Sequence, residues 1–517
     1  MKVLSHPNAI RADAGRSPLD MTYFHPKESL SEDDIRLGMR MMLYDAAFVT
    51  VLAILTTGAF LVGFALALGA SNAVVGVIAA AGPLAQILQL PSIVLIERYR
   101  KRKLLTLYAA AVSRMTWFFI ALAPWVVPRE YWIPSFLVLL FVHFATGNLT
   151  NCAWNSWVRD LVPTPVFGTF FAKRMALATF IGAVLSVAGA IAVDMGKQHY
   201  GSPIGAYTGI FVIAAVSAVV SLFFIARMPE PEMPVQSGAT VREILRQPLR
   251  DATFRSVLIF LAWWNFAVNF AAPFFAVYMI RKLEMSMVWV IGLSVLSQMV
   301  NVLFFRVWGR LADRYSNKSV LTVSGPLFIV TFLVWPFTTM PDAYFLTIPL
   351  LIAIHVLAGI STAGVTLCTS NLAFKAAPYG KATAYLAVNA LISGVMATIA
   401  PVAAGLVGDY CERFELQIML RGIDTVTGAA RFDVPTVDLQ GLDYVFLLAA
   451  VFGAIAIHRL LAVREEGEVE EAVVRQELML QMRRMARQVS TVAGMRQVIN
   501  FPFGTLKQWR QRRRETE

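Results

Sequence analysis

The amino-acid sequence predicts an all-α membrane protein with twelve transmembrane helices in two pseudo-symmetric six-helix bundles. Three observations support this fold class: an apolar composition, a series of long apolar runs and an internal repeat. Hydrophobic residues make up 57% of the 517 residues and charged residues only 15%, whereas soluble domains carry about 25% charged residues. Together with a mean hydropathy of +0.62, this composition indicates that the chain folds in lipid.

Twelve apolar runs are long enough to cross a bilayer, because about twenty residues at 1.5 Å per residue span roughly 30 Å of hydrocarbon. Backbone groups exposed to lipid must form hydrogen bonds within their own segment, so these runs are predicted to be helices, with no competing strand pattern. They cover residues 43–68, 73–96, 104–127, 132–156, 174–195, 205–226, 254–280, 287–308, 320–340, 343–367, 383–408 and 441–462.

The basic residues gather in alternate loops, which predicts that these loops and both termini are cytoplasmic. They are found in residues 97–103 (ERYRKRK), and then as Arg159, Lys173, Arg174, Arg242, Arg246, Arg250, Arg310, Arg314 and Lys318. The loops on the other side are nearly free of charge. We therefore expect a multi-pass protein of the cell inner (plasma) membrane. The formal charge of +12 is explained by these loops and tails, and no nucleic-acid partner is expected.

The segments outside the spans complete the predicted organisation. Residues 1–42 form a cytoplasmic N-terminal arm whose part 24–42 is predicted to be a short amphipathic helix with Ser31 as N-cap. Residues 43–226 and 254–462 form the two bundles, joined by a cytoplasmic linker at 227–253, and residues 410–440 form a long outer loop. The basic tail 463–517 suits a helix lying on an anionic leaflet. A solvated or partly disordered helix is the alternative for this tail.

The two halves repeat each other at a nearly constant offset. A shift of 216 places Glu97-Arg98-Tyr99 on Asp313-Arg314-Tyr315 and Arg102 on Lys318, a shift of 215 places Asp194 on Asp409, and a shift of 212 places His143 on His355. We infer parallel repeats of six spans, related by an axis along the membrane normal.

On the basis of these residues, the sequence resembles the major facilitator superfamily of secondary transporters. The family signature between spans two and three of each half is Gly-x-x-x-Asp-Arg-x-Gly-Arg-Arg/Lys. The second half matches it at Gly309, Asp313, Arg314 and Lys318 and departs from it at Ser316 and Asn317. The first half keeps only Glu97, Arg98 and the basic residues from Arg100 onward, with Ile93 in the glycine position. The resemblance covers about residues 40–462 and implies the twelve-helix fold.

The signature has a physical role that we expect here. A carboxylate at a helix end can cap another helix, and a neighbouring Arg can bind a carboxylate across an interface. Such contacts hold the cytoplasmic side shut in one state and break in the other. Arg159 and Asp160, at the end of span four, are expected to meet Glu97 or Arg98. The alternative is an ordinary loop held inside by its charge.

The resemblance implies that spans one, four, seven and ten line a central cavity. Span four carries Asn148, Asn151 and Asn155 on one helical face. Because these amides are costly in lipid, they bind either solute or a neighbouring span. In span seven, Asn265 and Asn269 lie on one face among aromatic side chains. They form either a solute wall or a hydrogen-bonded helix contact.

Three further residues are candidates because they are polar and deep in their spans. His143 and His355 occupy matching places in spans four and ten. Each is either a proton acceptor coupled to transport or a neutral, hydrogen-bonded histidine. Arg114 lies about 15 Å into span three and needs an anionic partner. That partner is either a group on the solute or Asp45, and we favour Asp45.

The function predicted from these features is a secondary active or facilitative transporter that moves a small solute by alternating access. A second class is a transporter-like membrane scaffold or receptor that binds a ligand or partner without moving it. No enzyme is expected, and no metal or other cofactor, because phosphate-loop, zinc-ligand and nucleophile motifs are missing from the sequence. The sparse cysteines predict no disulfide framework. A monomer is expected, in contact with lipid and a small-molecule solute, and whether protons or another ion drive transport is left open.

Overall fold

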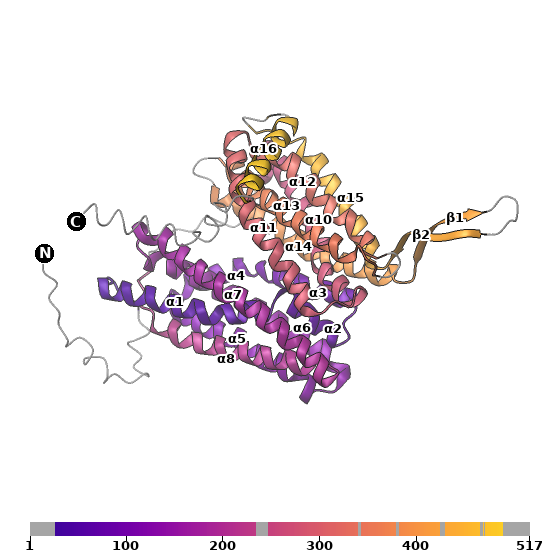
Figure 1. Ribbon diagram of the computed structural model, residues 1–517. Helices are drawn as coiled ribbons and strands as arrows, with labels where there is room; N and C mark the ends of the chain where they lie inside the picture. Colours follow the sequence, from indigo (N-terminus) through magenta and orange to yellow (C-terminus); the bar gives the residue numbers. More distant parts are fainter. Residues whose placement is uncertain are drawn as a thin grey trace.

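The structure is a computed structural model that describes residues 26–233, 247–339, 343–378, 382–423, 430–465, 469 and 471–489. Its helices form two bundles (Figure 1). Most of the predicted N-terminal arm, the basic linker residues Arg242 and Arg246, and the tail beyond Val489 lie outside the described residues.

The first bundle contains eight helices that make up six spans. The first span is α1 with α2, and the second is α3 with α4; the four others are single helices. The elements are α1 (Glu32–Leu55), α2 (Gly58–Ala67), α3 (Asn72–Gln86), α4 (Gln89–Tyr99), α5 (Arg102–Val126), α6 (Trp132–Leu161), α7 (Thr164–Tyr200) and α8 (Ile204–Arg227).

The second bundle repeats this arrangement and ends with a helix of the tail. Its elements are α10 (Ala252–Val277), the π-helical turn η3 (Tyr278–Lys282), α11 (Met287–Arg314), α12 (Asn317–Val334), the 3-10 turn η4 (Trp335–Thr338), α13 (Thr347–Ala376), α14 (Ala382–Cys411), α15 (Leu442–Leu460) and α16 (Glu471–Val489). Within the described ranges, eleven helices are long and apolar enough to cross a membrane, or twelve when the bent pair α3–α4 counts as one span. The predicted twelve-helix fold class is confirmed.

The first span differs from its prediction at its start and in its middle. No separate amphipathic helix precedes it, because α1 runs without a break from Glu32 into the apolar segment. Ser31 does act as the N-cap: its hydroxyl accepts a hydrogen bond from the Asp34 backbone N–H at 3.1 Å. The span then breaks after Leu55, where the hydroxyls of Thr56 and Thr57 donate to carbonyls one turn back, a bond that bends helices.

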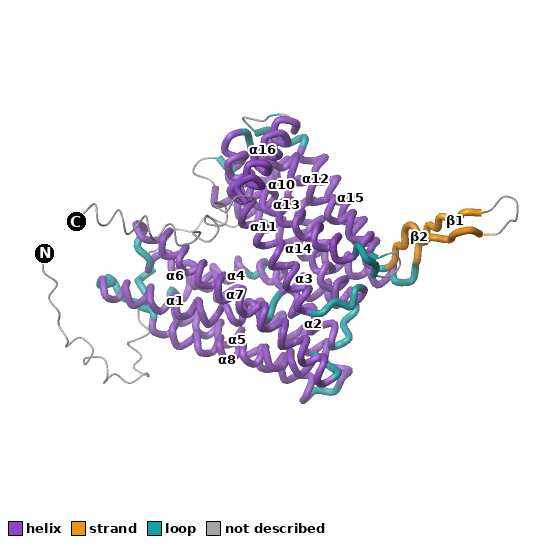
Figure 2. Tube along the Cα trace, viewed as in Figure 1, coloured by secondary structure: helices purple, strands orange, loops and turns teal. Residues whose placement is uncertain are grey.

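The predicted outer loop 410–440 contains two strands, so the expectation of a chain without strands is wrong. Strands β1 (Glu415–Ile423) and β2 (Ala430–Gln440) pair antiparallel, with Glu415 opposite Gln440. The hairpin projects away from the second bundle (Figures 1 and 2). Its apolar residues alternate over too few positions to signal a membrane strand, and the surrounding apolar runs hide the pattern. We call this end of the molecule the hairpin side, and the end that carries α16 and the start of α1 the tail side.

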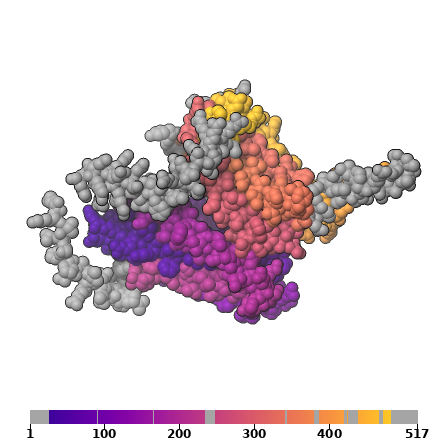
Figure 3. Space-filling model, in the orientation of Figure 1, coloured from indigo at the N-terminus to yellow at the C-terminus, as the bar shows by residue number. Residues whose placement is uncertain are grey.

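The two bundles touch near the hairpin side and diverge toward the tail side (Figures 1 and 3). Contact is made between α3 and α14, between α7 and α11, and between α2 and α10. The α3–α14 contact is close enough to exclude a side chain: a Cβ added at Gly76 would lie 2.2 Å from the Pro401 carbonyl oxygen, and one at Gly405 would lie 2.4 Å from the Asn72 carbonyl oxygen. Small residues thus let the backbones of the two bundles meet.

A methyl group at Gly76 is predicted to weaken this contact. The Gly76→Ala variant should show a lower apparent Tm, because overpacking costs about 1–3 kcal/mol. Gly292, the residue related to Gly76 by the repeat, is the matched control, since a Cβ there meets nothing within 4 Å. Thermal unfolding of the purified protein measures both variants, and equal Tm values for G76A and G292A would contradict the packing argument.

Candidate solute site and gates

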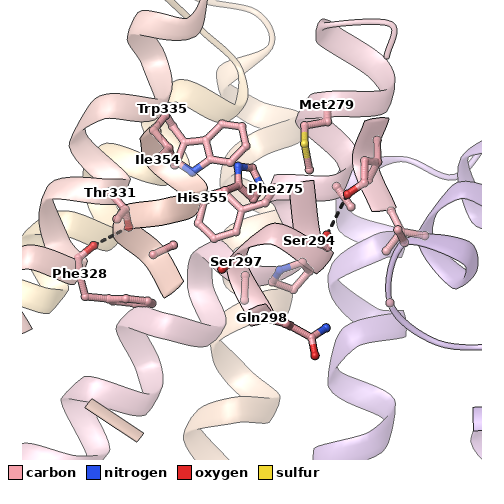
Figure 4. A pocket seen from close by; sticks show the side chains of 18 residues that line it. Phe275, Met279, Ser294, Ser297, Gln298, Phe328, Thr331, Trp335, Ile354 and His355 are labelled. Atoms are coloured by element: carbon pink, nitrogen blue, oxygen red, sulfur yellow. Dashed lines mark hydrogen bonds between the residues drawn. The ribbon is translucent and has the colours of Figure 1, made fainter. Parts of the chain in front are cut away.

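A cavity of about 370 Å³ lies in the second bundle and is closed on one side by α2 of the first bundle. Its volume is within the range of small-molecule sites. The wall is mainly apolar, with Phe275, Trp335 and Ile354 among its members, and its side-chain polar groups come from Ser294, Ser297, Gln298, Thr331, Trp335 and His355. In Figure 4 the rings of Trp335 and Phe275 lie beside the His355 imidazole, while the Phe328 ring and the Gln298 amide lie apart from them. The cavity is therefore suited to a largely apolar solute with a few hydrogen-bonding groups.

Of the sequence-predicted candidates, His355 is the one that lines this cavity. Its Nδ1 lies 2.8 Å from the Leu351 carbonyl oxygen, and a carbonyl can only accept a hydrogen bond. Nδ1 therefore carries the proton, and Nε2 of the neutral ring is an acceptor. The Trp335 ring packs edge-on against the imidazole, with 5.8 Å between centroids. A solute that donates a hydrogen bond would be recognised at Nε2.

The related His143 has a different environment and lies within the first bundle. Its Nδ1 is 2.8 Å from the Ser113 carbonyl oxygen, and the Trp117 indole nitrogen is 3.1 Å from the same ring atom. Both partners belong to α5, whereas His143 belongs to α6. These bonds make His143 a contact between two helices and leave it apart from the cavity.

Three asparagines likewise bond to neighbouring backbone. Asn148 donates to the Ala85 carbonyl of α3 at 2.6 Å. In α10, Asn265 donates to the Leu261 carbonyl at 2.8 Å and lies 3.2 Å from the Ser393 hydroxyl of α14, and Asn269 donates to the Asn265 carbonyl. The amides of Asn148 and Asn265 thus join two helices, whereas that of Asn269 bonds within α10.

Asn151 and Asn155 differ from Asn148 because both are exposed. They follow Asn148 on α6 by three and seven residues, so they lie on nearly the same face, which adjoins α3. The sequence left two roles open for these amides, a bond to solute or a bond to a neighbouring span. Within the described part of the chain, neither residue forms a hydrogen bond to a neighbouring span.

Arg114 is buried, with 5% of its surface exposed, and its guanidinium lies 3.8 Å from the Asp45 carboxylate of α1. This is the partner that we favoured from the sequence. The pair joins α1 to α5 inside the first bundle, away from the cavity lining.

Two aspartates close the hairpin side by capping helices of the opposite bundle. Asp194, near the end of α7, accepts hydrogen bonds from the first two backbone N–H groups of α11, at 2.7 and 2.8 Å. Asp409, near the end of α14, accepts from the first two N–H groups of α3, at 2.8 and 2.9 Å. A carboxylate at a helix N-terminus is stabilised by unpaired N–H groups and by the helix dipole. Asp194 and Asp409 are related by the sequence repeat. Each bundle thus supplies a carboxylate that caps a helix of the other bundle.

On the tail side of the first bundle, the predicted partners of Asp160 are wrong. Asp160 pairs with Arg102 at 2.5 Å, while Glu97 and Arg98 are exposed on α4 and Arg98 lies over the Tyr99 ring. Arg102 is fully buried and also lies 3.8 Å from Glu230. Because α4 ends at Tyr99 and α5 begins at Arg102, it is Arg102 at the helix start that reaches α6. Arg159 is exposed.

Glu230, which follows α8, caps α5 by accepting a hydrogen bond from the Arg102 backbone N–H at 2.5 Å. Burial raises the pKa of the Glu230 carboxyl, although the N–H groups of Lys103 and Arg102 and the Arg102 guanidinium oppose the shift. Glu465, which follows α15, does the same for α12: it accepts from the Lys318 backbone N–H at 2.7 Å. Arg102 and Lys318 are the pair matched by the 216-residue shift, so the repeat extends to these caps, which the sequence reading missed.

The rest of the signature in the second half lies at the end of α11. Arg314 is 3.8 Å from Glu477 of α16, and Asp313 is exposed. A Cβ at Gly309 would lie 3.7 Å from the Leu367 side chain of α13. Helix α16 itself packs on the bundle through the buried Val474 and Leu478. Arg314 and Lys318 of the tail-side signature thus contact Glu477 and Glu465 of their own half of the chain.

Comparison with known proteins places this geometry in a family. The model of the Major Facilitator Superfamily matches residues 46–401. No curated protein sequence matches the chain.

Several solved transporter structures share the fold. The nucleoside transporter NupG covers 83% of this chain and 98% of its own at 13% identity, with a TM-score of 0.59. A bacterial homologue of the human lysosomal transporter Spinster, inward-facing and unoccupied, covers 84% and 97% at 14% identity, with a TM-score of 0.58. A POT family transporter in complex with 5-aminolevulinic acid covers 84% and 97% at 11% identity, with a TM-score of 0.56. At these identities the likeness supports the fold alone.

Removing the charge of the reciprocal caps is predicted to open the hairpin side. In a variant with Cys152, Cys368 and Cys411 replaced by Ala, a reporter cysteine at the buried Ala70 should react faster with an impermeant maleimide when Asp194→Asn or Asp409→Asn is added. The loss of the negative charge at a helix N-terminus costs about 0.3–1 kcal/mol, so the rate should rise up to about five-fold for each change and further for both.

The control for this measurement is Asp33→Asn, which alters an exposed carboxylate at the start of α1, on the tail side. Reporter labelling in D33N should match the parent protein. Equal labelling rates in D194N, D409N and the parent would show that the caps do not hold the hairpin side closed.

Proposed function

The chain belongs to the Major Facilitator Superfamily and is a transmembrane transporter of small solutes; we propose that it works by alternating access, with the two bundles rocking about a shared solute site. The observation that carries this mechanism is the asymmetry of the contacts between the bundles. Carboxylate caps join them on the hairpin side, and no such bond joins them on the tail side within the described residues. One side is closed while the other is free to move.

The solute site of this proposal is the cavity lined by His355. Its wall comes from α10, η3, α11, α12, η4 and α13 of one bundle and from α2 of the other, so a tilt of one bundle against the other changes the wall. Asn151 and Asn155 would join the site from the first bundle, because exposed amides at this depth of α6 are costly against lipid. We assign Arg114, His143, Asn148 and Asn265 to contacts between helices, and Asn269 to a hydrogen bond within α10.

The tail side is proposed to be cytoplasmic. The basic residues of the short connections, among them Arg98, Arg100 and Arg310, are exposed at that side, and positive residues are retained in the cytoplasm. The conformation seen here is then open toward the cytoplasm, and the signature residues Asp313 and Arg314 would engage the other bundle when the tail side closes, with Arg314 leaving Glu477. A cell inner membrane is the expected location.

His355 is the titratable residue of the cavity lining, which contains no carboxylate or basic side chain apart from it. If a proton drives transport through this cavity, His355 Nε2 is the position proposed to receive it. Otherwise Nε2 accepts a hydrogen bond from the solute.

Cross-linking the hairpin side is predicted to stop transport. A Cβ at Gly408 would lie 3.4 Å from the Asn72 Cβ, near the separation that a disulfide needs. In protein without native cysteines, N72C/G408C should lose saturable uptake into liposomes when oxidised and regain it when reduced. The transported compound is the member of a solute panel that raises the Tm most.

The matched control is a cross-link within one bundle. A Cβ at Gly453 would lie 4.0 Å from the Ile329 Cβ, and both residues belong to the second bundle. Oxidised I329C/G453C should therefore transport like the reduced protein. Unchanged uptake by oxidised N72C/G408C would exclude alternating access, and absence of uptake by any form would favour a ligand-binding scaffold.

Replacing His355 tests the cavity. The His355→Phe variant keeps a ring but loses the acceptor, so we expect the affinity for the panel solute to fall about two- to ten-fold, as for one hydrogen bond. His143→Phe should instead lower the Tm and leave the affinity unchanged, because His143 bonds to Ser113 and Trp117. Titrations of solute-induced stabilisation measure both; identical affinities in H355F and wild type would remove His355 from the site.

A further inference from the structure

Arg174 occupies a position that the sequence reading assigned to a cytoplasmic loop. Helix α7 begins at Thr164, so Arg174 lies ten residues into the helix rather than in a loop. Its side chain is half-buried in the first bundle, and a guanidinium in such a place requires compensation by an anion or by water. The contacts that the chain itself offers compensate the charge of Arg174 only in part.

The guanidinium of Arg174 packs on the Trp154 ring of α6, with 4.7 Å from Cζ to the ring centroid. Its Nε is buried and has no hydrogen-bond partner among the described residues. The Asp45 carboxylate attracts it from beyond ion-pair distance, and this carboxylate pairs with Arg114 at 3.8 Å. Among the described residues Arg174 thus has no ion pair of its own, which leaves an excess of one positive charge beside the Asp45–Arg114 pair.

The contact between Arg174 and Trp154 lies on the surface that faces the second bundle. Helix α6 packs against α3, and α7 packs against α1. Helices α3 and α7 are also the ones that contact α14 and α11 of the second bundle. The surface between α3 and α7 thus faces the other half, and the Arg174–Trp154 pair bridges its two sides.

The exposed amides of α6 belong to this same surface. At about 100° per residue, Asn151 lies between Asn148, which bonds to α3, and Trp154, which contacts α7. Asn151 and Asn155 are exposed, and Arg174 and Trp154 are half-buried. An ion that approaches between the bundles would meet a guanidinium backed by an indole and flanked by two amide donors.

We propose that Arg174, with Asn151 and Asn155, binds the single anionic group of the transported solute, which would be a small organic anion such as a monocarboxylate. This inference rests on the proposed transport function. A planar guanidinium fork matches a carboxylate, and one bound negative charge would balance the excess of one positive charge.

The test compares acids with their uncharged amides on the full-length protein. Thermal unfolding is followed in neutral detergent at constant ionic strength, with butyrate, hexanoate, benzoate or phenylacetate and with the four corresponding amides. We expect at least one carboxylate to raise the Tm more than its amide does. Arg174→Gln should weaken that carboxylate about ten- to a hundred-fold, the loss of one charge-assisted hydrogen bond.

Two further variants keep the test decisive. Arg174→Lys retains the charge without the planar fork, so it should fold and show intermediate affinity, which separates ligand loss from misfolding of R174Q. Arg98→Gln removes an exposed arginine of α4 and should behave like wild type. A carboxylate shift that persists undiminished in R174Q, or amides that stabilise as well as acids, would overturn the inference.

The remaining outcomes distinguish this inference from the transport proposal. If an uncharged panel member is taken up and that uptake stops on cross-linking N72C/G408C, while no carboxylate stabilises the protein, transport stands and the anion site fails. If phosphatidylglycerol raises the Tm through Arg174 and none of the carboxylates does, the site holds a lipid headgroup, and the inference again fails.

Discussion

The interaction on which the rest of the structure depends is a carboxylate placed on the first N–H groups of a helix. Four of these caps form two symmetric pairs in which the carboxylate comes from a distant segment of the chain. Within the bundles, Glu230 caps α5 and Glu465 caps α12. Between the bundles, Asp194 caps α11 and Asp409 caps α3. Each cap satisfies N–H groups that a helix cannot satisfy itself and places a negative charge at the positive end of its dipole.

The caps between the bundles are polar, which explains how the hairpin side can be closed and still be able to open. Caps contribute about 0.5–2 kcal/mol each, which is small beside the apolar burial that holds each bundle together. The close approach of α3 and α14 at Gly76 and Gly405 aligns the helix ends with their caps. A few kcal/mol separate two states when the minor one is populated at 0.1–10%, and two caps lie in this range. The cavity lies beside these contacts, so closure and solute binding involve the same helices.

Much of the fold could be predicted from the sequence because hydrocarbon thickness fixes how long an apolar run must be. The repeat could also be predicted, and its match of Asp194 with Asp409 corresponds to the reciprocal caps. Their partners could not be predicted, since the N–H groups at Asn72 and Met287 carry no side-chain signal. Arg174 was assigned to a loop because hydropathy marks where a helix leaves lipid rather than where it starts, and α7 begins at Thr164. For the same reason the predicted partner of Asp160 was Glu97 or Arg98, whereas the observed partner is Arg102 at the start of α5. His355 and His143 look alike in sequence, and only the packing of Trp335 and Trp117 separates a cavity residue from a helix contact.

The most direct test of the account is the distance between the tail-side ends of the two bundles, measured by pulsed electron spin resonance. Spin labels at the exposed Val166 of α7 and Arg310 of α11 report it, because these helices touch near the hairpin side. The account predicts a major long distance and a minor short one, with the short distance gaining population when Asp194 and Asp409 are both changed to Asn. A single distance that is the same with and without the caps would contradict it.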